Sequence, residues 1–397
     1  MALLARLVTT AGLLAAVVYA VLAVVAVLRF PFTRRGAPAD RDARPRLSLL
    51  KPVRGLDPLR GEADAQAAAD LRRALELNLT SFFVQDYVGT FEIIFGFQDP
   101  EDPAIALVED VCARYPHVAS RVVRVPRAGG PNKKASVLAA LAREATGDVL
   151  VVSDQDMRVD PGYLDAVAAG FCGDDVGVVT CPYRTRWADD LGGAFEALAI
   201  NVDFIPSTLV ACTLDRWLSF ALGATMAVRR ETLRAIGGFE GLEPFLADDY
   251  LLGNRALHAG WRVVMSPYVV DNILGPTSFR QFFDHQLRWN RGYRVCRQNG
   301  YLFSVLMNGT AFAVAGLALG VLGLQTFFAW IAFRLCVASF LFRRVAGRPV
   351  SPSWLLLVPV KDLITLVLWA LAVRGNQVHW AGRTFTLARD GRLEPVS

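Results

Sequence analysis

Long uncharged runs near both ends of the chain enclose a middle section of short apolar runs. Near the N-terminus, Leu7 to Leu28 lies between Arg6 and Arg29 and contains no charged residue. At about 1.5 Å per residue, a helix of this length crosses a hydrocarbon core of about 30 Å. We therefore expect an uncleaved membrane anchor. The alternative, a cleaved signal peptide, has a shorter apolar region that ends at a small-residue cleavage site, whereas Arg29-Phe-Pro-Phe follows here.

A second apolar region begins after residue 300. Tyr301 to Phe333 is uncharged, and as a helix of about 50 Å it is too long for one straight span, which predicts a helical hairpin. The second helix of this hairpin should run to Phe342. The first should end near a group of glycines, Gly316, Gly320 and Gly323.

Charged residues interrupt the C-terminal apolar segments. Arg334 lies in the expected second helix, and Lys361-Asp362 interrupts a last apolar run, Trp354 to Val373. Charges inside a membrane are costly, so these side chains should face protein or water and can pair with one another. A full span at Trp354 to Val373 would leave the arginine-rich tail on the outer side, against the positive-inside rule. A re-entrant or interfacial segment is the alternative.

Between the membrane segments, β-rich runs alternate with helical stretches, which is typical of an α/β domain. Strands are expected at Leu47–Pro52, Phe91–Phe97, Arg121–Val125, Val149–Ser153 and Val176–Thr180, and helices at Ala67–Leu77 and Lys134–Thr146. Continuous apolar strands suit a parallel sheet that is covered on both faces. The chain should thus consist of an anchor at 1–35, an α/β domain at 36–300, membrane helices at 301–375 and a tail at 376–397.

Charge and cysteine content indicate in which compartment the α/β domain lies and which kinds of partner it can bind. Against Arg6 before the anchor, six arginines follow it, which places the α/β domain in the cytoplasm; they are Arg29, Arg34, Arg35, Arg41, Arg44 and Arg46. The net charge is +5, yet no basic nucleic-acid motif is present, so attraction to anionic lipid explains the excess better than nucleic acid does. The six cysteines contain no Cys-x-x-Cys pair and would stay reduced.

The clearest candidate chemistry is Asp154-x-Asp156, directly after the apolar run that starts at Val149. Open α/β sheets bind ligands at the C-terminal ends of their strands, and two carboxylates there can ligate a divalent metal, Mg²⁺ or Mn²⁺. Such an ion would neutralise a diphosphate leaving group. By itself Asp-x-Asp is more commonly a loop or a helix cap.

Three further aspartates, in two separate segments, are candidates for contact with a ligand. Asp99 follows the expected strand Phe91–Phe97, although Asp99-Pro100 also starts a turn naturally. Asp248 and Asp249 precede a helical stretch that they could simply cap.

A mixed aromatic and cationic group lies just before the second apolar region. His285, Arg288 and Trp289 fall within about two helical turns and suit a diphosphate or an interfacial acceptor. The alternative is an interfacial helix with Trp and Arg at headgroup depth.

In this order, and between these membrane segments, the motifs resemble the inverting GT-A glycosyltransferases of the processive and lipid-linked type. The closer resemblance is to ceramide glucosyltransferases and their bacterial relatives, including the hopanoid-modifying enzymes. It covers roughly residues 47–295 and rests on Lys51-Pro-Val-Arg, Phe97-Gln-Asp-Pro, Pro131-Asn-Lys-Lys, Gly223-Ala-Thr-Met, Asp248-Asp-Tyr and Gly260-Trp-Arg. It implies an α/β, Rossmann-like GT-A domain with an N-terminal anchor and C-terminal membrane helices.

The resemblance also implies roles for the candidate residues. Asp249 would be the general base. The nucleotide-sugar contacts would be Lys51, Pro52, Asp99, Lys133, Asp154 and Asp248; the metal ligands Asp154 and Asp156; and the diphosphate and acceptor contacts His285, Arg288 and Trp289. Two departures stand out: His285 replaces Gln or Arg, and the ceramide enzymes of animals lack the second carboxylate of Asp154-x-Asp156.

The resemblance implies transfer of glucose from a UDP-sugar donor to a membrane lipid, with ceramide as the leading acceptor. The alternatives are a UDP-N-acetylglucosamine-dependent enzyme acting on a hopanoid, a processive polysaccharide synthase, and a scaffold on a decayed transferase fold. A channel for polymer export would need more than the roughly four spans that hydropathy indicates. Phe204 to Leu222 is a candidate platform for the acceptor or a plain core helix.

Overall fold

The computed structural model describes residues 2–33, 44–54, 65–125, 129–215, 217–380 and 382–396. Arg34, Arg35 and Arg41, and the predicted domain boundary after residue 35, lie outside these residues. The chain forms two compact units. The sheet unit comprises Phe32–Tyr183 and Asp215–Gly275, and the helical unit comprises Met1–Pro31, Arg184–Leu214 and Pro276–Ser397.

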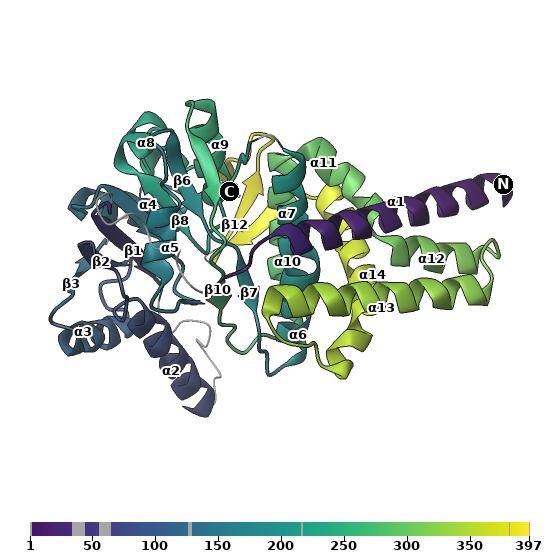
Figure 1. Cartoon of the computed structure of the whole chain (residues 1–397), viewed down its shortest axis with the longest axis horizontal. Coiled ribbons are helices and arrows are strands. Elements are labelled where there is room, and N and C mark those ends of the chain that lie inside the picture. Colours follow the sequence, from purple (N-terminus) through teal and green to yellow (C-terminus); the bar gives the residue numbers. More distant parts are fainter. Residues whose placement is uncertain are drawn as a thin grey trace. The chain divides into compact units, whose positions relative to one another are not determined.

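A seven-stranded sheet of order β3-β2-β1-β4-β8-β6-β9 forms the centre of the sheet unit (Figure 1). Its strands are β1 (Leu47–Val53), β2 (Phe91–Phe97), β3 (Ala119–Arg124), β4 (Val149–Val152), β6 (Val176–Thr180), β8 (Met226–Arg229) and β9 (Arg262–Met265). β1 to β4 run parallel, β6 is parallel to β9, and β8 lies antiparallel between β4 and β6. The predicted α/β fold with a mostly parallel sheet is therefore confirmed.

β1 lies at the point where the order of the strands reverses. The chain continues from β1 to β2 and β3 on one side, and later adds β4 on the other side. Open α/β sheets bind ligands in the crevice outside the carboxyl ends of the strands at such a point. β4 is buried at all four residues, and Lys51 near the end of β1 is 0% exposed. The buried strands β1 and β4 thus fix the positions of the polar residues that follow them.

The helices of the sheet unit are α2 (Ala65–Ser81), α3 (Ala104–Arg114), α4 (Lys133–Glu144), α5 (Tyr163–Ala169), α8 (Arg230–Ala235) and α9 (Asp248–His258). α4 packs on β1 and β2. The approach is close because a Cβ atom at Gly96 of β2 would lie 2.5 Å from Val137 Cγ1. Directly after Asp156 comes β5 (Met157–Arg158), which pairs antiparallel with β10 (Val270–Asn272). β7 (Tyr183–Thr185) contains a boundary between the units.

The helical unit contains the long apolar helices of the described residues (Figure 1). Its helices are α1 (Ala2–Arg29), α6 (Leu191–Leu198), the π-helical turn η3 (Ala199–Phe204), α7 (Ile205–Leu214), α10 (Phe279–Cys296), α11 (Gln298–Phe303), α12 (Gly309–Ala318), α13 (Leu324–Ala346) and α14 (Pro352–Arg374). A meander of β11 (Gln377–Trp380), β12 (Arg383–Leu387) and β13 (Leu393–Pro395) follows α14.

Four helices in the described part of the chain are long and apolar enough to cross a membrane: Ala2–Arg29, Leu191–Leu214, Leu324–Ala346 and Pro352–Arg374. A fifth span results if the bent pair Gln298–Met307 and Gly309–Ala318 is counted as one. The predicted break of the hairpin near the glycines is confirmed, because α12 ends at Ala318. The second helix does not stop at Phe342; it continues to Ala346 and ends at the left-handed Gly347 (φ 70°), since a polar last turn can remain helical.

Small residues allow the membrane helices to pack closely. α1 contacts α12 and α13, and Ala16, Ala313 and Trp330 form a common buried cluster. A Cβ atom at Gly309 would lie 2.2 Å from Trp330 Cζ2. Close packing through Gly and Ala is the usual source of helix association where no hydrophobic driving force acts between helices.

Candidate active site

Lys51 connects the two strands at the switch point of the sheet. It lies near the end of β1, and its Nζ donates a 2.7 Å hydrogen bond to the main-chain oxygen of Asp154, just after β4. The same ammonium lies 3.7 Å from the centre of the Phe82 ring. Burial lowers the pKa of Lys51 to about 7 against the opposing effect of Asp154 and Asp156. Lys51 therefore fixes the position of the Asp154-x-Asp156 loop, and its assignment as a nucleotide contact stays a prediction.

Asp154 forms an ion pair with Lys134 in the first turn of α4. Lys134 Nζ lies 2.5 Å from Asp154 Oδ1. The α4 helix is held at this end by Asn132, whose side chain accepts from Ala135 N at 2.9 Å and donates to Phe245 O at 2.8 Å. Asn132 is 0% exposed. This buried cap places a cation next to the first carboxylate of the motif.

Gly223 marks the point at which three charged side chains converge. A Cβ atom on Gly223 would lie 3.3 Å from Asp154 Oδ2, 3.5 Å from Asp249 Oδ2 and 3.7 Å from Lys134 Nζ. The amide of Gly223 also donates to Asp249 Oδ2 at 3.1 Å. The absence of a side chain at this glycine thus leaves space between two carboxylates that are 95 positions apart in the sequence.

Asp248 and Asp249 begin helix α9, where the partial positive charge of the N-terminus favours carboxylates. Asp249 Oδ1 accepts from Tyr250 N at 2.7 Å. Asp248 is 8% exposed, and its buried Oδ2 has no hydrogen-bond partner among the described residues. The N-cap residue of α9 is Ala247, which makes no side-chain cap hydrogen bond, so the two aspartates lie in the first turn and do not cap the helix.

The carboxylates of Asp154, Asp248 and Asp249 lie around a single lysine, Lys134, so this region favours the binding of further positive charge. Burial, and then the neighbouring carboxylate of Asp248, raise the pKa of Asp249 to about 6. Burial lowers the pKa of Lys134, but the carboxylates of Asp154, Asp248 and Asp249 outweigh it and raise that pKa above its ordinary value. Three carboxylates thus share one lysine, an arrangement that a further cation would relieve.

The carboxylates partly satisfy the requirements of a divalent metal. Asp154 and the exposed Asp156 follow β4, and Asn272 Nδ2 donates to Asp156 Oδ2 at 3.0 Å. No group of three or more His, Cys, Asp or Glu residues suited to a metal occurs among the described residues. Mg²⁺ usually needs only one or two protein carboxylates, because substrate phosphates and water supply its other ligands. The residues therefore fit an ion that binds together with a diphosphate.

Three other predicted contacts lie at the same edge of the sheet or beside it. Asp99 follows β2, is exposed, and accepts from Glu101 N at 3.0 Å, as the Asp-Pro turn predicts. Pro52 pairs with Gly96 across the parallel strands β1 and β2. Lys133 is the first residue of α4. The roles of these residues in nucleotide binding stay predictions.

His285, Arg288 and Trp289 lie on α10 of the helical unit. A capping box of Ser278 and Gln281 starts this helix. His285 Nδ1 lies 2.9 Å from Oε1 of Glu196, whose side chain is 3% exposed.

Aromatic contacts surround the second half of this α10 motif. Trp289 contacts the rings of His285, Phe204 and Tyr293, with centroid distances of 4.5, 5.2 and 6.2 Å. Arg288 is partly buried. The helix therefore presents an aromatic group with an oriented imidazole, and its role on the acceptor side stays a prediction.

Sequence reasoning did not single out Lys134, Asn132, Gly223 or Glu196. Asn132 and Lys134 lie in the Pro131-Asn-Lys-Lys segment used for the resemblance, but the sequence does not show which of the two adjacent lysines reaches Asp154. Gly223 carried a signal, since it opens the Gly223-Ala-Thr-Met segment used for the resemblance. Asn132 and Glu196 act through contacts with residues 113 and 89 positions away.

The space at Gly223 yields a testable prediction. Gly223→Ala should lower activity about tenfold to a hundredfold, because the added methyl group lies 3.3 Å from Asp154 Oδ2, which must shift, and fills the space beside Asp249. Gly223 lacks a positive φ, so the backbone should tolerate alanine and thermal unfolding should change little. Gly129→Ala is the matched control, since its Cβ would meet only Glu243 Oε2 at 3.6 Å. Wild-type rates in Gly223→Ala would contradict the convergence at this glycine.

The architecture has a counterpart among solved structures. A mannosyltransferase from Pyrobaculum calidifontis, solved with GDP-mannose and Mn²⁺, superposes with a TM-score of 0.53, covering 91% of this chain and 99% of its own at 19% identity. The likeness establishes the GT-A glycosyltransferase fold that the sequence predicts.

Curated relatives match smaller parts of the chain. Ceramide glucosyltransferase 3 of Caenorhabditis elegans is 24% identical over 247 residues, which is 62% of this chain and 50% of the relative. The ceramide glucosyltransferase of Komagataella phaffii is 31% identical over 122 residues, which is 30% of this chain and 21% of the relative. The chain therefore spans about half the length of the first of these proteins.

A family model covers nearly the whole chain. The model of glycosyl transferase family 21 matches residues 8–393. The chain belongs to glycosyl transferase family 21, and the resemblance drawn from its motifs is confirmed.

Proposed function

We propose that this protein transfers glucose from UDP-glucose to a lipid held in the membrane, with ceramide as the acceptor, and that the anomeric configuration is inverted. The observation that carries the proposal is the convergence of Asp154, Asp249 and Lys134 around Gly223. This position, at the switch point of the sheet, is where an α/β fold binds its ligand. Membership of family 21 and the similarity to ceramide glucosyltransferases support the same reaction class.

Asp249 is the general base in this proposal. It accepts the proton of the acceptor hydroxyl while that oxygen forms a bond to the anomeric carbon of the donor. The bond from this carbon to the diphosphate breaks on the opposite face, and UDP leaves with the electron pair. A carboxylate whose pKa is raised to about 6 is well matched to this task, because it is ionised at neutral pH yet still basic enough to take a proton.

Asp154 and Asp156 hold the diphosphate end of the donor, together with Lys134. A divalent ion bound by the two carboxylates would neutralise the charge that develops on the leaving UDP. Lys134 contributes a fixed positive charge beside Asp154. Lys51 holds the Asp154-x-Asp156 loop in place through its hydrogen bond to the main-chain oxygen of Asp154. Donor binding thus rests on charges that are already ordered before the substrate arrives.

The helical unit binds the lipid acceptor. The apolar helices, which are long enough to cross a membrane, retain the tail of the lipid, and His285, Arg288 and Trp289 of α10 contact the acceptor side. The arginines after α1 favour a cytoplasmic location of the sheet unit, where UDP-sugars are made available. Phe204 to Leu222 is divided between the two units, so only its first part belongs with the acceptor helices.

The rate of transfer should depend on pH through Asp249. The base must be ionised, so activity is expected to fall about tenfold per pH unit below about 6 and to level off above about 7. Asp248→Asn should move this limb to lower pH, because the loss of a neighbouring negative charge lowers the pKa of Asp249. The measurement is a profile of kcat against pH at saturating donor and acceptor. A limb that stays in place in Asp248→Asn would contradict the assignment.

A panel of donors and acceptors tests the proposed reaction. The purified protein in lipid nanodiscs is incubated with radiolabelled UDP-glucose, UDP-N-acetylglucosamine or GDP-mannose, and with ceramide, diacylglycerol or a hopanoid. Label is expected in ceramide from UDP-glucose, with one hexose per lipid. Preference for N-acetylglucosamine and a hopanoid would replace the proposal by its alternative, and products longer than two sugars would point to a processive synthase.

A further inference from the structure

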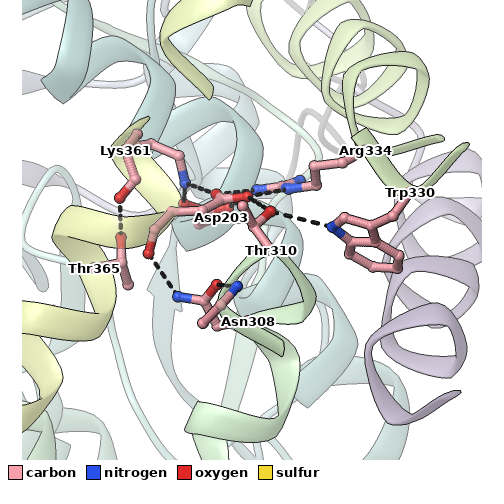
Figure 2. A network of polar contacts seen from close by, with 9 residues as sticks. Asp203, Asn308, Thr310, Trp330, Arg334, Lys361 and Thr365 are labelled. Carbon is pink, nitrogen blue, oxygen red and sulfur yellow. Dashed lines mark hydrogen bonds and ion pairs between the residues drawn. The ribbon is translucent and has the colours of Figure 1, made fainter. Parts of the chain in front are cut away.

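Four charged side chains meet among the apolar helices of the helical unit. Arg334 of α13 donates to Asp362 of α14 from Nε and Nη2, both at 2.8 Å, and its Nη2 also donates to Asp203 Oδ1 at 3.1 Å. Lys361 Nζ donates to Asp203 Oδ2 and lies 3.0 Å from Asp362 Oδ1. Figure 2 shows Lys361 and Arg334 approaching Asp203 from opposite sides. We call Asp203, Arg334, Lys361 and Asp362 the charge cluster.

The two carboxylates of the charge cluster differ in their environment. The side chain of Asp362 is 7% exposed and also accepts from Thr310 Oγ1 at 2.7 Å. The side chain of Asp203 is 39% exposed, although Lys361 beside it is only 2% exposed. A carboxylate can accept about four hydrogen bonds. Asp362 accepts its hydrogen bonds from groups of the protein, whereas the partly exposed Asp203 can accept further hydrogen bonds from a ligand.

The surroundings of Asp203 point to a ligand rather than to a purely structural pair. Asp203 lies in the π-helical turn η3, and such turns occur frequently at functional sites. The next residue, Phe204, contacts the ring of Trp289 at 5.2 Å between centroids and that of Tyr293 at 6.1 Å. A partly exposed carboxylate, paired with the buried Lys361 and the partly buried Arg334, thus lies next to Phe204, which contacts the aromatic group of α10.

We propose that Asp203 binds the headgroup of the lipid acceptor and selects lipids that keep a hydroxyl or amide N–H donor after the reacting hydroxyl is engaged. The inference rests on the proposed function and names the determinant of its acceptor. Ceramide, an N-acylated amino diol, has two such donors. Diacylglycerol has none, because its single hydroxyl is the one that reacts. A phosphate headgroup is disfavoured by the charge of Asp203 itself.

The central variant is Asp203→Asn, which keeps the size of the side chain and removes its charge. Hydrogen bonds to a charged group are the stronger ones, so the affinity for ceramide should fall about tenfold to a hundredfold. Binding of UDP-glucose should be unchanged. The variant also leaves Lys361 and Arg334 with one carboxylate between them, so its effect on folding has to be separated from its effect on the acceptor.

Two further variants make this separation. Asp362→Asn removes the other carboxylate of the charge cluster and should lower the temperature of unfolding at least as much, while ceramide affinity stays within about twofold of wild type. Asp203→Asn combined with Lys361→Met removes one charge of each sign and keeps the cluster neutral. It should unfold close to the wild-type temperature and still bind ceramide weakly.

The deciding experiment measures binding without donor, in nanodiscs, of a short-chain fluorescent ceramide and of its analogue methylated at the amide nitrogen and the secondary hydroxyl. Wild type should bind ceramide at least about tenfold more tightly than the analogue, and Asp203→Asn should bind both alike. The inference would be overturned if Asp203→Asn still discriminated as wild type does, or if wild type did not discriminate at all. It would also be overturned if Asp362→Asn lost as much ceramide affinity as Asp203→Asn.

The same samples are assayed for transfer, so that the two proposals can fail separately. Discrimination through Asp203 without any transfer of glucose would remove the proposed function and leave the binding site intact. Transfer of glucose to ceramide with unchanged discrimination in Asp203→Asn would remove the binding site and leave the function intact.

Discussion

Asp249→Asn is expected to lower the rate of glucose transfer by about a thousandfold or more, the upper part of the range that a general base contributes. Asparagine cannot accept the proton of the acceptor hydroxyl. It can still accept one of the two hydrogen bonds that Asp249 receives from Tyr250 N and Gly223 N. The fold and the binding of UDP-glucose should therefore change little, and the loss should appear in kcat.

The matched control is Asp175→Asn on the surface of the same unit. Asp175 pairs with Arg262 at 3.1 Å, and both side chains are about half exposed, so removal of this pair should leave transfer and stability nearly unchanged. Nucleotide affinity is measured by titration calorimetry in parallel with single-turnover rates. If Asp249→Asn turned over like the control, the base would have to be another residue.

Removal of divalent metal is expected to stop transfer, and Mn²⁺ or Mg²⁺ should restore it. Asp154 and Asp156 provide only two carboxylates, and no third metal-binding residue joins them among the described residues. Binding of the ion should thus depend strongly on the diphosphate of the donor. Asp156→Asn should raise the Mn²⁺ concentration needed for half-maximal activity about tenfold or more, in line with the loss of one ligand.

The chain itself offers an alternative to the metal. Lys134 already lies 2.5 Å from Asp154, and a lysine can neutralise a leaving phosphate without a metal. Chelation with EDTA, followed by titration of Mn²⁺ monitored by electron paramagnetic resonance and by rate, distinguishes the two. Full activity in EDTA would assign the neutralisation of the diphosphate to Lys134 alone and would contradict a metal at Asp154 and Asp156.

The strands of the sheet could be predicted well where apolar runs end at turn residues. Phe91–Phe97 and Val176–Thr180 have the predicted bounds. The strand β8 (Met226–Arg229) was not predicted, because four residues with one polar end carry little periodic signal. Its antiparallel place between β4 and β6 is a tertiary property. Without β8, Gly223 could not be placed beside Asp154.

The membrane part shows a similar limit. The helix of α6, η3 and α7 contains Glu196 and Asp203, which interrupt its apolar pattern, and hydropathy alone did not separate it from the α/β region. In the structure it belongs to the helical unit together with segments more than sixty positions away. The prediction that the charges of α13 and α14 face protein or pair is confirmed by Arg334 and Asp362. The contribution of Asp203 could not be foreseen, because it comes from a distant helix.

The most direct test of the proposed transfer is the structure of its product. Wild-type protein and Asp249→Asn are reconstituted in vesicles that contain ceramide and are given UDP-glucose labelled at the anomeric carbon. Wild type is expected to form a monoglucosylceramide with the β configuration, seen by mass spectrometry and by nuclear magnetic resonance, and Asp249→Asn is expected to form almost none. A product with the α configuration, or no labelled lipid from wild type, would contradict the proposed transfer.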